Sequence, residues 1–339
     1  MLFELPHFEH ITVKTVNEAI AMLQEQDGKA AVIAGATDLL GLMKDRIQGP
    51  ELKIPEVLIN IKSIPEMSRM GVDPEGTLRI GAAVTLTHLG NHALVKERFP
   101  ILSQAAHQVG TTPLRNMGTL GGNLCQRPRC MYFRHPHFLC FKKGGTSCFA
   151  VAGEHRDYHS ILKLGKCVMA HPSDMAPSLM ALKASAVIVG PEGERQIALQ
   201  DFFLDANATR ETVLRSNEFL KEVRIPGQQG KRYQVFLKQR IRHSADFALS
   251  SVAVVMKMEK GVCGEVHLVL GGVAPRPTIA SDAETILRGK TWDEELLSRA
   301  ADAALEGSRP LPHNRYKVGL TRAVLKRALT QLWKEATGA

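Results

Sequence analysis

Residues 115–130 read RNMGTLGGNLCQRPRC, and the chain continues with HPHFLCFKKGGTSC (135–148) and LGKCVMAHPSD (164–174). This stretch opens on a glycine-rich turn and holds five of the six cysteines of the chain. It closes at Asp174, just before an apolar run. The turn and the thiols together predict a nucleotide cofactor beside a metal centre.

The turn 117–123 (MGTLGGN) carries three glycines, which let the backbone approach a ligand closely and adopt positive φ. Thr119 and Asn123 add polar side chains, so a diphosphate is the ligand that best suits this turn. Neither G-x-G-x-x-G after a strand nor GK[ST] occurs, which excludes the Rossmann and P-loop interpretations. A structural glycine loop explains the motif equally well at this stage. A second turn, 35–38 (GATD), lies between an expected strand at 30–34 and an expected helix at 39–46.

Four cysteines are separated by nine, seven and eighteen residues: Cys130, Cys140, Cys148 and Cys167. No C-x-x-C occurs, so neither a zinc ribbon nor a ferredoxin run is indicated. Eight Lys or Arg but only two acids occupy 127–166, and this excess would offset the negative charge of a thiolate-bound [4Fe–4S] cluster. Five histidines leave a mixed Cys/His zinc site open: His135, His137, His155, His159 and His171. Unrelated buried thiols are the third alternative.

Length, composition and net charge limit the classes of protein to which this chain can belong. A length of 339 residues with 44% hydrophobic residues predicts two or three domains. No apolar run is long enough for a membrane span, and no leader peptide is visible, so we expect a cytoplasmic chain, or a periplasmic one if a signal-bearing partner exports both. The net charge of +9 is spread along the chain and aromatics make up 5%, which argues against nucleic-acid binding.

The pattern of expected secondary structure changes near residue 228. Before it, short strands are expected at 57–61, 78–83, 186–189 and 219–226, between helices. After it, three alternating strands (233–241, 250–258 and 266–274) precede three helices (283–289, 292–307 and 314–336). Antiparallel strands followed by helices predict a separate α+β domain.

Asp174 and Lys238 are ambiguous from sequence alone. Asp174 either caps the helix that follows it or bonds a cofactor. Lys238 shares one strand face with Arg240 and Arg242, which a solvated sheet edge would also explain. No nucleophile motif and no carboxylate pair can be singled out, so no catalytic residue is predicted on this chain.

Four motifs taken in order resemble one family: AVIAGATDL (31–39), LRNMGTLGGNLC (114–125), PSDMAPSLMALKA (172–184) and LKQRIRHSADFALSSVAV (237–254). They resemble the FAD-binding medium subunit of the molybdenum hydroxylases, the xanthine dehydrogenase and carbon monoxide dehydrogenase group. The resemblance implies an α+β fold: a vanillyl-alcohol-oxidase-type (PCMH-type) FAD-binding domain in two subdomains over 1–227, and a CO-dehydrogenase-flavoprotein-like domain over 228–339. The latter is expected to pair a three-stranded antiparallel sheet with helices.

The resemblance also implies the residues that contact FAD. The family's positions carry over to Ile33, Ala34, Gly35, Ala36, Thr37, Asp38, Leu39, Thr119, Gly122, Asn123, Asp174 and Lys238. Ala36 departs from the family, which usually has a second glycine there, and an alanine could require negative φ.

Residues 126–170 form an insertion of about 40 residues that most members of the family lack. Two relatives carry such an insertion with a [4Fe–4S] cluster: the medium subunits of 4-hydroxybenzoyl-CoA reductase and of the bacterial periplasmic aldehyde oxidoreductase. QRPRCMYF and HPSDMA resemble the latter more. The resemblance implies Cys130, Cys140, Cys148 and Cys167 as ligands. It leaves out Cys125, which cluster-free members share, and Cys263 is expected to be structural.

The implied function is electron relay within a heterotrimer. A large molybdenum-cofactor subunit oxidises the substrate, and a small subunit with two [2Fe–2S] clusters passes electrons to FAD here and on to an external acceptor. In a 4-hydroxybenzoyl-CoA reductase-type enzyme the flow would run inward. A zinc-stapled cofactor-binding protein without a redox role is the alternative from another class.

Overall fold

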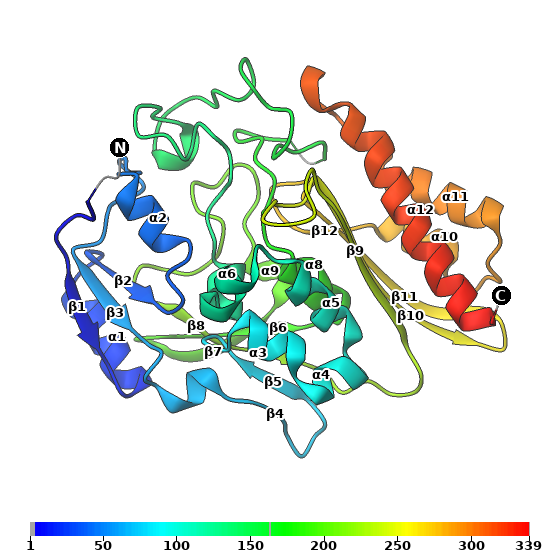
Figure 1. Ribbon diagram of the computed structural model, residues 1–339, viewed down its shortest axis with the longest axis horizontal. Coiled ribbons are helices and arrows are strands. Elements are labelled where there is room, and N and C mark those ends of the chain that lie inside the picture. Colours follow the sequence, from blue (N-terminus) through cyan, green and yellow to red (C-terminus); the bar gives the residue numbers. More distant parts are fainter. Residues whose placement is uncertain (1–3, 163, 339) are drawn as a thin grey trace.

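The computed structural model describes residues 4–162 and 164–338, and it contains three sheets (Figure 1). The expected domain ends at residues 1 and 339 lie outside the described residues, as does Lys163 of the insertion. No helix in the described part combines the length and apolarity needed to cross a membrane.

The N-terminal part is a small parallel sheet of order β1-β3-β2 with two helices. Its elements are β1 (Glu9–Thr12), α1 (Val16–Glu25), β2 (Ala30–Ile33), α2 (Leu39–Lys44) and β3 (Val57–Asn60). Thr15 caps α1 by accepting a hydrogen bond from the N–H of Glu18. The turn between β2 and α2 is one wall of the site described below.

The middle part is an antiparallel sheet of order β4-β5-β8-β6-β7, packed against short helices. Its strands are β4 (Met70–Val72), β5 (Leu78–Gly81), β6 (Ser185–Gly190), β7 (Gly193–Ala198) and β8 (Phe219–Ile225). Its helices are η1 (Pro65–Ser68), α3 (Leu86–Asn91), α4 (Ala93–Arg98), α5 (Pro100–Gln108), α6 (Thr112–Met117), α7 (Leu120–Leu124), α8 (Met175–Ala181) and α9 (Leu199–Phe202).

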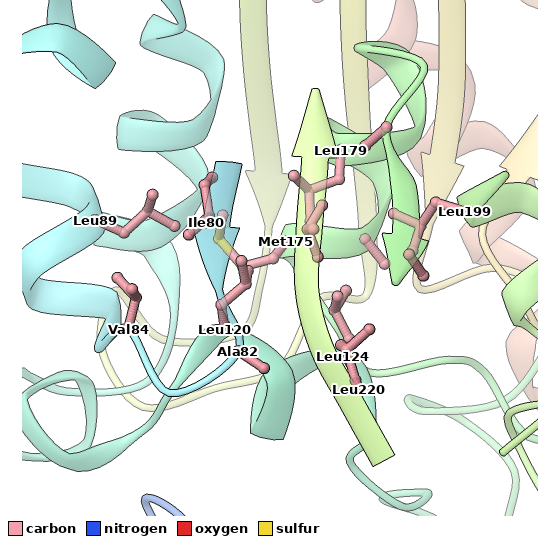
Figure 2. Packing of buried hydrophobic residues seen from close by; sticks show 14 of the residues in the cluster. Ile80, Ala82, Val84, Leu89, Leu120, Leu124, Met175, Leu179, Leu199 and Leu220 are labelled. Carbon is pink, nitrogen blue, oxygen red and sulfur yellow. The ribbon is translucent and has the colours of Figure 1, made fainter. Parts of the chain in front are cut away.

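The largest hydrophobic core lies in this middle part and holds α7 in place. Leu120 and Leu124 of α7 are fully buried, and they belong to one cluster with Ile80, Met175 and Leu220 (Figure 2). Burial of a leucine side chain contributes about 1.5–3 kcal/mol. The glycine-rich turn is therefore anchored by the core on its far side.

The C-terminal part is an antiparallel sheet of order β12-β11-β10-β9 covered by helices. Its elements are β9 (Tyr233–Gln239), β10 (Ser250–Glu259), β11 (Val262–Gly271), β12 (Thr278–Ile279), α10 (Ser281–Leu287), α11 (Glu294–Ala303), η3 (Pro312–Asn314) and α12 (Tyr316–Thr337). The three strands expected from the sequence are present, and the short β12 adds a fourth strand that the pattern did not predict.

The described part of the insertion between α7 and α8 is almost entirely loop, with η2 (Phe141–Lys143) as its one helical turn. Figure 1 shows these loops (green) lying between α2 and α12. Hydrogen bonds and ion pairs join them to Asp38 at one end and to Lys317 of α12 at the other.

Candidate functional site

A cavity of about 390 Å³ separates the β2–α2 turn from α7 and β8. Its walls include all the predicted FAD positions from Ile33 to Leu39, together with Thr119 and Gly122 of the turn 117–123. The segment from Leu214 to Leu220 closes a further side, and no sequence motif marked that segment. The turns 35–38 and 117–123, which are far apart in the chain, thus line the same cavity.

Gly35 shows how closely the two turns approach each other. A Cβ atom placed on Gly35 would lie 2.1 Å from the carbonyl oxygen of Met117 and 2.9 Å from Cα of Gly118. Only glycine fits there. Within the described residues, the N–H groups of residues 35–38 find no protein acceptor, so they are available to an anion.

Ala36 corrects a sequence-based expectation. We expected that an alanine at this position could require negative φ, but its φ is +61°. The left-handed conformation costs a non-glycine residue about 1–2 kcal/mol. The side chain of Ala36 packs against the small apolar cluster of Ile33, Met43 and Leu58.

The carboxylate of Asp38 faces the insertion. Its oxygens lie 2.7 Å from Arg129 Nη2 and 2.6 Å from Arg134 Nη2, and they accept from the N–H of Arg127 at 2.8 Å. Burial lowers the pKa of Arg129 to about 10, with the charge of Asp38 opposing that effect. Asp38 therefore ties the cavity wall to the insertion, a role that the motif did not reveal.

Asn123 lies behind the cavity wall. Its Oδ1 accepts from Ser173 Oγ at 2.6 Å, which joins α7 to the start of α8. Ser173 Oγ in turn accepts from the N–H of Ala176. The helix-cap alternative for Asp174 is therefore wrong, because Ser173 supplies the cap and Asp174 makes no side-chain cap bond.

Asp174 and Lys238 form a buried ion pair, with 2.6 Å between Oδ2 and Nζ. Lys238 also donates to the carbonyl oxygen of Gln108, as does Arg240. The solvated-edge alternative is thus wrong for Lys238, whereas the side chain of Arg242 is exposed. Burial raises the pKa of Asp174, and its Oδ1 has no partner among the described groups. Neither member of the pair lines the cavity.

The four predicted cysteine ligands gather within the insertion. Cys130, Cys140 and Cys148 belong to one small apolar cluster. The neighbouring thiol of Cys167 lowers the pKa of Cys148 to about 6, while burial raises the pKa of Cys130 to about 11.

The remaining two cysteines lie elsewhere. Cys125 packs on the large core and lines the cavity, and burial raises its pKa to about 12. Cys263 is fully buried in the C-terminal core, as expected of a structural residue. All six are free thiols.

Across the described residues, no three or more His, Cys, Asp or Glu side chains are close enough to hold a single metal ion. A zinc ion requires ligand atoms about 2.0–2.3 Å from one point. A [4Fe–4S] cluster puts its own iron and sulfide atoms between the thiolates, so its ligands stand farther apart. The two kinds of centre therefore require different separations between the four thiols.

Two lysines that follow Cys140 are buried. Lys142 lies 3.2 Å from a carboxylate oxygen of Glu211, which also binds Arg127. Lys143 donates to the carbonyl oxygen of His135, and no carboxylate pairs with it in the described structure. Burial lowers the pKa of Lys143, while the charges of Cys140 and Cys130 oppose that effect. The sequence showed only an excess of positive charge in the insertion, and no motif identified Glu211 as the partner of Lys142 and Arg127.

Comparisons with known proteins agree with this arrangement. Residues 6–228 match the family model described as FAD binding domain in molybdopterin dehydrogenase, and residues 235–332 match the CO dehydrogenase flavoprotein C-terminal domain. The chain therefore belongs to the family of FAD-binding medium subunits of molybdenum hydroxylases. It is an oxidoreductase subunit, and the expected fold class is confirmed.

Individual relatives cover nearly the whole chain. The aldehyde oxidoreductase FAD-binding subunit PaoB of Escherichia coli (strain K12) is 33% identical over 339 residues, covering 97% of this chain and 99% of that protein. The carbon monoxide dehydrogenase medium chain of Hydrogenophaga pseudoflava is 29% identical over 334 residues, covering 97% and 98%. A crystal structure of carbon monoxide dehydrogenase from the same organism superposes with a TM-score of 0.78, at 27% identity and 98% and 99% coverage.

Proposed function

We propose that this chain is the FAD- and [4Fe–4S]-binding electron-transfer subunit of a heterotrimeric molybdenum hydroxylase of the aldehyde-oxidising type. Its partners are a large molybdenum-cofactor subunit and a small subunit with two [2Fe–2S] clusters. The chain relays electrons from these partners to an external acceptor. The likeness to an aldehyde oxidoreductase subunit over the full length supports the choice of complex.

The observation that carries the FAD part is the cavity between the two glycine turns. In this proposal Ile33 to Leu39, Thr119 and Gly122 hold the diphosphate, with the N–H groups of residues 35–38 as donors. Asn123 acts through Ser173, by fixing α7 to α8. In the same proposal Asp174 and Lys238 contact the flavin, although neither lines the cavity, and the unpartnered Oδ1 of Asp174 is the atom that would accept a hydrogen bond from it.

The cluster part depends on charge as well as on thiols. Cys130, Cys140, Cys148 and Cys167 are the proposed ligands, and Lys143 is a buried cation that no carboxylate of the described residues pairs with. A buried charge is costly unless it is paired. A net anionic cluster held by four thiolates would supply the missing counter-charge. FAD, when bound, accepts and donates electrons singly or in pairs, which suits a relay between one-electron clusters and an acceptor.

The proposed domains are 1–227, which includes the insertion 126–170, and 228–339. The first contains the proposed cofactor ligands except Lys238, which the second contributes from β9.

The test is anaerobic quantitation of iron, sulfide, zinc and flavin in the purified complex. We expect about four iron and four sulfide per FAD, as for one Cys₄-held cubane cluster. Zinc in place of iron would support the zinc-stapled alternative, and a chain without flavin would contradict the proposal. Reduction of an acceptor by aldehydes would separate outward electron flow from a reductase that requires a low-potential donor.

A further inference from the structure

His159 of the insertion lies against one of the proposed cluster ligands. Its Nε2 is 3.3 Å from Sγ of Cys130, and both side chains are buried. A thiolate sulfur that binds iron has no proton to donate, so the ring nitrogen must be the donor. Nδ1 of His159 has no partner among the described groups, which leaves the sulfur as the polar contact of this ring.

The main chain that carries His159 is held by the C-terminal domain. Lys317 of α12 is fully buried, and its Nζ donates to the carbonyl oxygens of Asp157, His159 and Gly272 at 2.8–2.9 Å. Asn314 donates to the carbonyl oxygen of Ser160 at 3.1 Å. A backbone bridge between His159 and Met169 fixes the other side. The ring is therefore held in place from two directions.

Resting on the proposed cluster, we infer that His159 is a positioning residue whose N–H···S hydrogen bond to Cys130 raises the reduction potential of that cluster. Reduction adds one electron to a group that is already anionic, and part of the added charge falls on the ligand sulfurs. An N–H donor stabilises the more negative state more than the less negative one. The buried surroundings strengthen this electrostatic preference.

His155 provides a matched control from the same insertion. It is as buried as His159, but its Nδ1 contacts the carbonyl oxygen of Ala150 and its Nε2 accepts from the N–H of His313. Its ring stacks on His313, and no sulfur contact is recorded for it among the described residues. Removing His155 tests the loss of a buried histidine without the loss of an N–H···S bond.

The experiment is a redox titration of the purified complex with dithionite and mediators, followed by EPR of the reduced cluster. For His159→Leu we expect about a tenfold smaller equilibrium constant for one-electron reduction, which corresponds to a potential about 59 mV lower. His159→Gln keeps an N–H donor and is expected to recover part of that shift. His155→Leu is expected to leave the potential unchanged.

An unchanged potential in an iron-replete His159→Leu complex would overturn the inference, and so would an equal shift in His155→Leu. If His159→Leu loses its iron, the wild-type complex labelled with ¹⁵N-histidine decides by ENDOR. Weak nitrogen coupling supports a hydrogen bond, whereas strong coupling identifies a direct ligand and refutes it. A wild-type complex without iron would refute the proposed cluster itself, which separates that failure from the others.

Discussion

The cavity between the glycine turns and the cysteine-bearing insertion are built on different physical principles. The cavity walls continue into the large hydrophobic core, where Leu120 and Leu124 are fully buried. The insertion has only a small apolar cluster and one helical turn of its own. It is held by ion pairs to Asp38 and Glu211 and by Lys317 of α12.

This difference indicates which of the two regions needs its bound cofactor to keep its structure. A wall fixed by core packing keeps its shape without a ligand, because packing alone over-determines the backbone. The insertion gathers thiols near Lys143, a buried cation that no carboxylate pairs with among the described residues and whose charge an anionic group would balance. We therefore expect flavin loss to leave the fold intact and cluster loss to loosen the insertion.

The largest expected effect comes from Cys140→Ser. Removing one proposed ligand is expected to abolish cluster binding, with iron and sulfide falling toward zero while FAD is retained. Iron analysis beside the flavin absorbance checks this. Cys125→Ser is the matched control, because Cys125 lies on the large core, and it is expected to keep its iron. Full iron in Cys140→Ser would refute the ligand set.

Gly35→Ala is expected to have the opposite effect, a loss of flavin with the cluster retained. Its Cβ would lie 2.1 Å from the carbonyl oxygen of Met117, so the two turns must separate. We expect at least about a tenfold loss of flavin affinity, which corresponds to about 1.4 kcal/mol, with the iron content unchanged. Flavin titration of the apoprotein measures it. Gly41→Ala of α2 is the control, since no atom lies within 4 Å of its added Cβ, and retained FAD in Gly35→Ala would contradict the close approach.

Asp38→Asn tests the link between the two regions. The change removes the counter-charge of Arg129 and Arg134, which are mostly buried. Breaking such a pair costs about 3–5 kcal/mol when it is fully buried, and less with partial exposure. We expect faster proteolysis within 126–170 and unchanged cleavage elsewhere. If the insertion stays as resistant as in the wild type, Asp38 does not anchor it.

The smallest expected effect is that of Ala36→Gly. The left-handed φ of +61° is strained for alanine, so glycine is expected to stabilise the turn by about 0.5–1 kcal/mol after its larger unfolded-state entropy is counted. Thermal unfolding of the flavin-free chain measures the gain. Lower stability of the variant would show that the surroundings favour the alanine side chain.

The sequence predicted the elements that local patterns encode. The buried strands β2 and β3 and the C-terminal hairpins were readable from periodicity and turns, and the clustering of the cysteines from their spacing. The resemblance of four motifs added the family, which the comparisons confirm. Four strands were missed: β4 and β12 have only three and two residues, and β1 and β7 are mostly exposed and polar, so they lack the apolar run that marked β2 and β3.

By itself, then, the sequence determined which chemical groups exist: two glycine turns, a set of thiols and an excess of cations. Only the tertiary structure decided which of them meet. The motif assigned Asp38 to a cofactor-binding turn, but in the structure its carboxylate binds the arginines of the insertion. Lys317 donates a hydrogen bond to His159, which is more than 150 residues away in the chain. Such contacts are set by long-range packing and burial, which local sequence does not encode.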